Sequence, residues 1–318
     1  IIEDQSYISE LSENERKHIK LAELSRGYRL ACRTMIKGNT VVLVPPESKV
    51  GVRKIQVEGM ERPVKLDPMV KKLHLILSKP TIHDVRPDFE RLTDSLKEGG
   101  FDQLETDREL LRILPDILRD AGWNITVTIW NNKRIISVEK GNTENAIYGF
   151  SVDIGTSKIV GYLVDLTSGE VISIKSLENP QTMYGEDILS RITYATTTGR
   201  GLKKLQAIVI EAINTLIHQA CQEAGVKPDK IYEITIVGNT AMHHFFLGIQ
   251  PKYLTLAPYV PAIKRPIDIK ANSLKIKTKN HANIHVLPVI AGFVGADAVA
   301  DVIATGIYEI NDICLLMD

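Results

Sequence analysis

The chain has 318 residues, of which 44% are hydrophobic and 25% are charged, and its 39 basic and 39 acidic residues give zero net charge. This composition is ordinary for a globular protein of about two to three domains, and it excludes a general affinity for nucleic acid or for an anionic membrane surface. The sequence has no apolar run of the roughly 18 residues that a membrane-spanning helix needs, and its acidic start does not match a signal peptide, so we expect a cytoplasmic protein.

Residues 1–50 and 51–76 are the first two predicted segments. The first contains a short polar helix and a β-like run at 40–44 that Pro45 and Pro46 end. The second has little periodicity and is predicted to be a linker.

Residues 77–145 predict a small α+β domain. Apolar residues over 88–96 recur at helical spacing, and residues 106–109 match a capping box that opens a second helix. Pro115 is expected to break or restart that second helix. A hairpin is predicted from two β-like runs, 125–130 and 134–138.

Residues 146–318 alternate between strand and helix patterns, which predicts a mixed sheet flanked by helices. A long amphipathic helix has its apolar face over 205–220, and Gly225 is its expected C-cap. The predicted strands are 148–154, 159–165, 171–175, 231–237 and 284–290. Cys221 and Cys314 are predicted to be core residues, the latter in a further strand.

The first candidate site is the turn Gly155-Thr156-Ser157, which follows an apolar strand and Asp153. Gly155 lets the backbone approach a bound group closely, and successive N–H groups in such a turn form an anion-binding concavity. Thr156 and Ser157 add hydroxyl donors, and Asp153 can hold Mg²⁺ directly or through water. An ordinary hairpin turn is the alternative, because short motifs recur by chance.

A second candidate, Gly238-Asn239-Thr240, follows the strand 231–237. Asn239 or Thr240 can cap the next helix, and a helix N-terminus at the end of a strand can hold phosphate. Most α/β turns share this form for structural reasons alone. The adjacent His243 and His244 point to different faces of a helix and lack the spacing of metal ligands, so we do not expect them to be catalytic.

A third candidate, 291–297, places two glycines and an acid before an Ala-rich helix. Asp297 is either a second acid near a nucleotide or a first-turn residue that the helix dipole favours. The basic stretch 264–279 predicts a solvated face, with a docking surface as the alternative.

Cys32, which follows Arg29-Leu30-Ala31, has a setting that suits a ligand of a plant-type iron–sulfur cluster. Such a cluster needs four thiolates, and the next cysteine is Cys221. A buried structural cysteine is therefore the alternative. An odd cysteine count also argues against a disulfide framework and favours a reducing compartment.

Five segments together resemble one family, the reductive activators of corrinoid proteins, which are ATP-dependent iron–sulfur proteins of anaerobes. The segments are 27–32, 152–157, 179–187, 237–244 and 291–297, in the order of the family. The resemblance implies an α/β fold: an ASKHA domain (RNase H-like, as in actin and Hsp70) over 146–318, and a middle α+β domain over 77–145. It also implies a linker over 51–76, and the tail of a 2Fe-2S ferredoxin-like domain over 1–50.

The resemblance also assigns roles to single residues. Cys32 matches the last ligand of the cluster, residues 153–157 match the first phosphate motif, and Asp318 matches the acid that opens the second. Asp153, Asp297 and Asp318 are thus expected to be acids of the nucleotide cleft. The expected cofactor-binding residues are Gly155, Thr156, Ser157, Gly238, Asn239, Thr240 and Gly295.

The chain begins with Ile1 rather than Met and ends in an apolar run, 315–318, so we expect a fragment that is truncated at both ends. The earlier cluster cysteines, the rest of the second phosphate motif and the adenosine motif are not in the sequence. We therefore expect a 2Fe-2S cluster only in the intact protein, and half of a site for ATP and Mg²⁺ in this chain.

The activity that the resemblance implies is ATP-dependent transfer of one electron from the cluster to an inactive Co(II) corrinoid, which gives Co(I). The implied partners are a corrinoid protein and an electron-donating reductase, with no nucleic acid and no membrane, and a homodimer stays open. One alternative is a small-molecule kinase on the same fold, which needs a general base that faces a substrate pocket. Another is a ferredoxin-like carrier or a scaffold without catalysis, and measurable ATPase activity would exclude a pure scaffold.

Overall fold

The structure is a computed structural model that describes residues 5–12, 15–16, 19–31, 33–43 and 65–316. The chain divides into two compact units, Ile1–Met60 and Glu61–Asp318. In the described residues no helix is long and apolar enough to cross a membrane.

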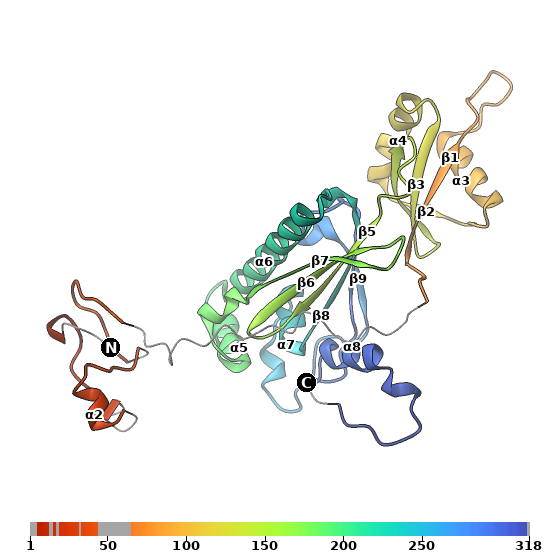
Figure 1. The fold of residues 1–318 in the computed structure, drawn as a ribbon. Helices are drawn as coiled ribbons and strands as arrows, with labels where there is room; N and C mark the ends of the chain where they lie inside the picture. The colour runs from red at the N-terminus through yellow and green to blue at the C-terminus, as the bar shows by residue number, and fades with distance from the viewer. Residues whose placement is uncertain (1–4, 13–14, 17–18, 32, 44–64, 317–318) are drawn as a thin grey trace. The chain divides into compact units, whose positions relative to one another are not determined.

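The first unit contains short elements, η1 (Gln5–Tyr7) and α2 (Leu21–Leu24), and an isolated bridge between Ile8 and Ile36 (Figure 1). The predicted β-like run is wrong for residues 40–43, which form no strand beyond one bridge position at Val42. Their apolar side chains stay exposed, so packing does not favour an extended pair there. Residue 44 lies outside the described residues.

The second unit begins with a small α+β part that contains a four-stranded sheet of order β1-β3-β4-β2 (Figure 1). Its strands are β1 (Val70–Ile76), β2 (Glu105–Thr106), β3 (Asn124–Trp130) and β4 (Arg134–Lys140), and its helices are α3 (Asp88–Glu98) and α4 (Arg108–Asp120). The predicted hairpin is confirmed as β3 and β4, and Asn131 and Asn132 in its turn have φ of 50° and 52°. Asparagine tolerates positive φ better than most residues, which suits this tight turn.

Strand β1 is missing from the sequence-based prediction, which placed residues 70–76 in a linker. Its lysines obscure the alternation that marks a strand. One of them, Lys72, points inward, and its Nζ is 2.9 Å from the carboxylate of Glu139 on β4. The buried ion pair therefore lets a charged residue take a core-facing position.

Two expectations for α4 are also wrong. The N-cap is Asp107 rather than Thr106, and its carboxylate makes no capping hydrogen bond because it pairs with Lys270 Nζ at 2.6 Å. Pro115 lies inside α4 without ending it. The hydrogen bond that proline removes would go to the carbonyl of Leu111, whose side chain is exposed, so solvent can take the place of the missing donor.

The larger part of this unit is built on a six-stranded sheet of order β7-β6-β5-β8-β10-β9. The strands are β5 (Tyr148–Ile154), β6 (Lys158–Asp165), β7 (Val171–Glu178), β8 (Ile231–Gly238), β9 (Ile267–Lys270) and β10 (Asn283–Val286). The first three form an antiparallel meander, β8 is parallel to β5, β10 is parallel to β8, and β9 closes the edge in the antiparallel sense.

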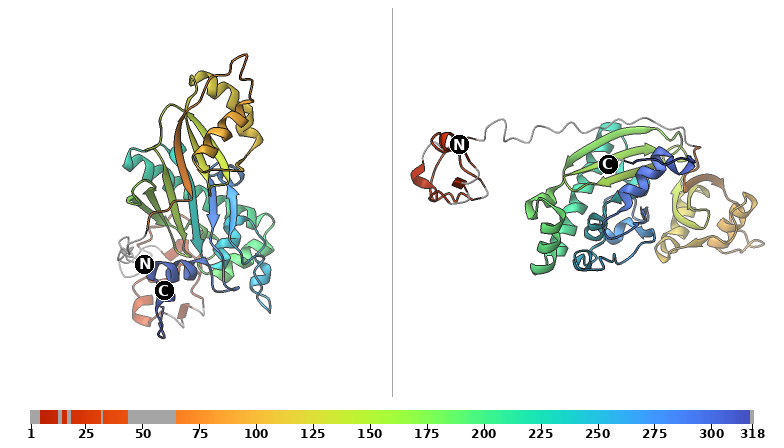
Figure 2. Two further views of the ribbon diagram at one scale, coloured as in Figure 1. Left: turned by 90° about the vertical axis from the view of Figure 1, so that its right-hand side faces the viewer. Right: turned by 90° about the horizontal axis from the view of Figure 1, so that it is seen from below.

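The helices of this part confirm the predicted mixed architecture. The long helix α6 (Gly201–Ala224) lies along β6 and β7, and it ends at Gly225 in the left-handed conformation, as predicted (Figures 1 and 2). The other helices are α5 (Ile188–Thr197), α7 (Thr240–Leu247) and α8 (Ala296–Thr305). Single 3-10 turns are η3 (Pro180–Tyr184), η4 (Pro228–Lys230), η5 (Lys252–Leu254), η6 (Ala271–Leu274) and η7 (Ile307–Glu309).

Two predictions near the end of the chain are wrong. The strand predicted over 284–290 stops at Val286, and Ile290 is half exposed. Cys314 is exposed and lies outside any strand, whereas Cys221 is buried in α6 as expected. The apolar run that contains Cys314 is not covered by any described residue, so it gains nothing from extended pairing.

Candidate functional site

The first two candidate turns meet because their strands are parallel neighbours. Strand β5 pairs with β8 so that Ile154 lies opposite Gly238. Parallel strands end at the same edge of a sheet, so the turn after β5 and the turn after β8 are side by side. Gly238 is required by this closeness, because an added Cβ would lie 2.7 Å from the carbonyl oxygen of Ile154.

Asn239 joins the two turns through its side chain. Its Nδ2 donates a hydrogen bond to Thr156 Oγ1 at 3.1 Å. Its Oδ1 accepts from the N–H groups of Ala241 and Met242, at 3.1 and 3.0 Å, so Asn239 is the N-cap of α7 as one of the predicted alternatives had it. These two N–H groups are thus satisfied within the chain. Asn239 therefore acts as a cap and as a link to the first turn.

The third candidate segment packs on the second. An added Cβ at Gly295 would lie 2.4 Å from Asn239 Cα, so the close contact requires glycine. Thr240 is buried, and its hydroxyl donates to the carbonyl of Ala291 at 2.7 Å. All three predicted segments are therefore brought together at one edge of the sheet, and Thr240 holds two of them in contact.

The predicted acids differ in their surroundings. Asp153 is exposed near the end of β5, and Ser157 in the following turn is exposed too. Burial and, to a smaller degree, the charge of Asp153 raise the pKa of Tyr162 on the neighbouring strand. Asp297 is half buried and accepts a hydrogen bond from Ala298 N at 2.9 Å in the first turn of α8, a position that the helix dipole favours.

The turn after β5 is tied to the chain behind it. The side chains of Asn179 and Arg191, both completely buried, donate to the backbone carbonyls of Gly155 and Thr156 at 2.8 and 2.7 Å. Sequence reasoning included Asn179 in the family-like segment 179–187 without giving it a role, and it did not single out Arg191. Their separation from the turn in sequence offers no pattern from which these bonds could be predicted.

The histidines after the second turn are buried and uncharged at neutral pH. Burial and the neighbouring His244 lower the pKa of His243 to about 4. His244 is fixed between two backbone groups, since Nε2 accepts from Ala262 N at 3.1 Å and Nδ1 donates to the Thr240 carbonyl at 2.7 Å. The ring of His244 therefore supports the second turn.

The cavity that borders the turns is small, about 30 Å³, which is room for a water molecule. It is lined by Ile188, Ile192, Asn239, Thr240, Ala241, Leu254, Gly292 and Phe293. A larger, open cavity of about 680 Å³ lies beside α3, over residues 80–88, and includes none of the three turns. Asn239 and Thr240 thus line the small cavity, whereas Asp153 and Ser157 are exposed.

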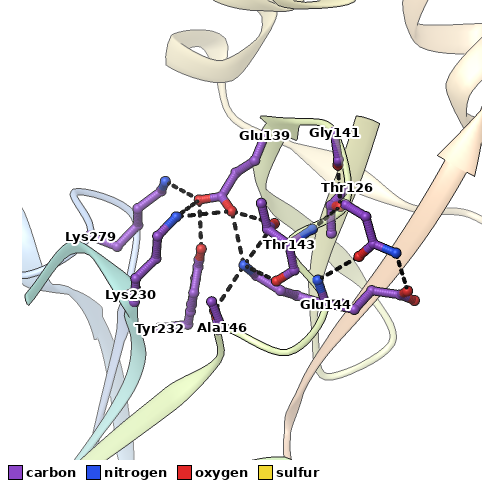
Figure 3. Close-up of polar contacts among 11 residues, drawn as sticks. Thr126, Glu139, Gly141, Thr143, Glu144, Ala146, Lys230, Tyr232 and Lys279 are labelled. Carbon is purple, nitrogen blue, oxygen red and sulfur yellow. Dashed lines mark hydrogen bonds and ion pairs between the residues drawn. The ribbon is translucent and has the colours of Figure 1, made fainter. Parts of the chain in front are cut away.

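A buried charge cluster that sequence reasoning missed joins the two sheets (Figure 3). The carboxylate of Glu139 on β4 contacts the Nζ atoms of three lysines and the hydroxyl of Tyr232 at the start of β8. The distances are 2.9 Å to Lys72, 3.2 Å to Lys230, 2.7 Å to Lys279 and 2.7 Å to Tyr232. Burial alone would raise the pKa of Glu139, but these hydrogen bonds together hold it well below its usual range.

Two predicted residues, Cys32 and Asp318, lie outside the described residues. The described cysteines do not form a cluster site, because Cys221 is buried in α6 and Cys314 is exposed. In the part of the chain that the structure describes, His, Cys, Asp and Glu side chains form no group of three or more that could hold a metal ion.

The sheet order, a meander of three strands followed by two parallel strands with intervening helices, is that of an ASKHA domain. Family models agree: the RACo linker region matches residues 59–145 and the RACo middle region matches residues 148–310. The chain belongs to the family of reductive activators of corrinoid proteins.

Two relatives illustrate the likeness. The corrinoid activation enzyme RamQ of Eubacterium limosum is 33% identical over 195 residues, which are 61% of this chain and 33% of the relative. A solved structure described as a reductive activator for a corrinoid, iron–sulfur protein superposes with a TM-score of 0.74 at 32% identity. The match covers 93% of this chain and 49% of that one, so the chain spans half or less of the proteins that it resembles.

Proposed function

We propose that residues 146–318 supply the first half of an ATP site, at the edge where the three turns meet. The observation that carries this proposal is the hydrogen bond from Asn239 to Thr156, which places the turn after β5 against the start of α7. The glycine turn after β5 offers backbone N–H groups to an anion, and the hydroxyls of Thr156 and Ser157 add donors.

The exposed carboxylate of Asp153 is suited to hold Mg²⁺ beside that turn, directly or through water. A bound Mg²⁺ would neutralise charge on the phosphates. Asp297, at the start of α8, is a further acid at the same edge. We assign Asp318 to the cleft as well, on the family resemblance alone.

For the whole protein we propose ATP-dependent reductive activation of a corrinoid protein, in which Co(II) gains one electron and becomes Co(I). Family membership supports this, as do the names of the two relatives, a corrinoid activation enzyme and a reductive activator. The proposed electron donor is a 2Fe-2S cluster with Cys32 as one ligand. The described residues form no site for this cluster. A reductase would reduce the cluster again after each electron transfer. We place the protein in the cytoplasm, alone or as a homodimer.

Anaerobic visible spectroscopy of the whole protein with its corrinoid partner tests this activity. With a chemical reductant present, the Co(I) absorption is expected to grow with ATP and to stay low without it. Equal growth in both samples would overturn the proposal. Phosphorylation of a small molecule, with no change at cobalt, would support the kinase alternative instead.

A further inference from the structure

We infer that Asn179 and Arg191 are positioning residues of the nucleotide site, which hold the turn Gly155-Thr156-Ser157 with its N–H groups directed outward. The inference rests on the proposed function, because it concerns the same turn. It also gives a role to the segment 179–187 and to α5, which lie outside the three candidate turns.

Asn179 lies directly after β7 and is completely buried. Its Oδ1 accepts from Gln181 N at 3.0 Å, and its Nδ2 donates to the carbonyl of Gly155 at 2.8 Å. The amide is thus held at both ends, by the 3-10 turn η3 and by the phosphate-binding turn. Its orientation is fixed by the backbone of η3, so it can fix the Gly155 carbonyl in turn.

Arg191 on α5 forms a hydrogen bond with the next backbone carbonyl, that of Thr156. Its Nη2 donates to Thr156 O at 2.7 Å, and its Nε donates to Gly185 O at 2.7 Å. The Sδ of Met242 on α7 lies between the two side chains, 3.7 Å from Asn179 Nδ2 and 3.8 Å from Arg191 Nη1. The three elements that meet at the turn are therefore tied together on its buried side.

The direction of these two carbonyls sets the direction of the N–H groups that follow them. In a trans peptide the carbonyl and the next N–H point in opposite directions. The carbonyls of Gly155 and Thr156 point inward to Asn179 and Arg191, so the N–H groups of Thr156 and Ser157 point away from these side chains. Outward N–H groups are what an anion at the exposed side of the turn requires.

The charge of Arg191 adds a second contribution. Its guanidinium is completely buried, and among the described residues it contacts carbonyl oxygens and a sulfur but forms no ion pair with a carboxylate. Arg91 on α3 is similarly buried and does pair, with Asp84 at 2.6 Å. Burial lowers the pKa of Arg191, and the charge of Asp187, the N-cap of α5, opposes this without forming a close ion pair. A phosphate at the turn would add a second negative charge near this buried cation.

Isothermal titration of the whole protein with ATP, ADP and adenosine tests the inference. We expect Asn179→Ala to weaken ATP and ADP binding about tenfold and to leave adenosine binding within about twofold, because only phosphates contact the turn. Asn214→Ala is the matched control, since Asn214 is also buried and bridges backbone groups, Lys275 O at 3.1 Å and Lys277 N at 2.8 Å. It should leave all three affinities unchanged.

Substitutions of Arg191 separate its charge from its geometry. Arg191→Lys keeps the charge, so Arg191→Gln should weaken ATP binding about tenfold more than Arg191→Lys does. If neither variant folds, Asn179→Ala still decides. Unchanged ATP affinity in Asn179→Ala, or an equal loss for adenosine, overturns the inference while the ATP site stands. A wild-type protein that binds no ATP overturns the proposed function itself.

Discussion

Trp130 Nε1 on β3 donates a hydrogen bond of 2.9 Å to Glu233 Oε2 on β8, and this bond joins the two sheets. The second donor to the carboxyl group of Glu233 is Asn283 Nδ2 at 3.0 Å. Both donors are neutral, in contrast to the lysines around Glu139. The pKa values of the two carboxyl groups that link the sheets are therefore shifted in opposite directions, down for Glu139 and up for Glu233.

The first prediction concerns the pH dependence that Glu233 gives to folding. Burial raises the pKa of Glu233 from 4.5 to about 7, the neighbouring Asp268 adds to this, and the bonds from Asn283 and Trp130 oppose it. Between these two values the unfolded chain has lost the proton that the folded chain keeps. The stability contribution of Glu233 therefore falls as pH rises through this window, by about 3 kcal/mol in all, and is constant above it.

Urea unfolding of wild type and Glu233→Gln measures this effect. Gln keeps the shape and still accepts from Trp130, so the wild type should lose about 2 kcal/mol relative to the variant between about pH 5 and about pH 7.5. The comparison with Glu233→Gln is needed because His243 also makes the stability of the fold depend on pH. The pKa of His243 is lowered to about 4, so its contribution to stability rises with pH in part of this window. A constant difference between the two proteins would show that Glu233 is already ionised at pH 5.

The second prediction concerns the cluster around Glu139. Glu139→Gln should destabilise the fold by about 3 kcal/mol, because Lys72, whose side chain is 1% exposed, would lose its counter-charge. The folded pKa of Glu139 lies below its ordinary value of 4.5, so this stability is present above that value and is lost as pH falls below it.

Urea unfolding at neutral pH checks this, with Glu105→Gln as the control. Glu105 is 3.8 Å from Arg134 and its side chain is 76% exposed, so its substitution should change stability by less than about 0.5 kcal/mol. Equal effects of the two substitutions would mean that the Glu139 cluster is no more than a surface network.

The third prediction separates the two tasks of Asn239. Asn239→Ala removes the cap of α7 and the bond to Thr156, so it should cost about 1 kcal/mol of stability. Asn239→Asp keeps the capping oxygen, so stability should change by less than about 0.5 kcal/mol. The new negative charge beside the turn should nevertheless weaken ATP binding by about tenfold or more. Urea unfolding measures stability, and titration calorimetry on the same samples measures ATP binding. Normal ATP binding by Asn239→Asp would contradict the prediction.

The sequence alone predicts an element correctly where the pattern that marks the element is local. The long helix α6 has an amphipathic pattern that ends at a glycine, and the hairpin of β3 and β4 has two β-like runs around a turn sequence, so both could be predicted from their own residues. Strand β1 could not, because the buried Lys72 breaks its pattern and the Glu139 that pairs with it is 67 residues away.

The candidate site shows the same limit. The glycines and polar residues of each turn were visible in the sequence, but the bond that joins Asn239 to Thr156 spans 83 residues. The hydrogen bond from Arg191 to the turn could not be predicted for a related reason. Nothing in a helix pattern indicates that a buried arginine reaches a turn 35 residues earlier. Contacts of this kind are set by the sheet order, which periodicity alone does not determine.

The last prediction concerns Asp153. In the whole protein, Asp153→Asn should lower ATP-driven corrinoid reduction by about one hundredfold or more, because metal-assisted charge stabilisation is worth several kcal/mol. The substitution keeps the size and hydrogen-bonding capacity of the side chain but removes the charge that attracts Mg²⁺. Asp153 is exposed, so the melting temperature should change little.

The matched control is Asp165→Asn, at the far end of the same hairpin, where Tyr148 pairs with Asp165. Its carboxylate accepts from Thr167 N at 2.7 Å in a turn, and Asn serves such a turn as well as Asp does. The measurement is the rate of Co(I) formation with saturating ATP at matched cluster content, for wild type and both variants. Near-normal rates in Asp153→Asn would show that the residue belongs only to a hairpin and that Mg²⁺ is held elsewhere. A hundredfold loss confined to Asp153→Asn, with an unchanged cluster spectrum, would place the metal beside the turn.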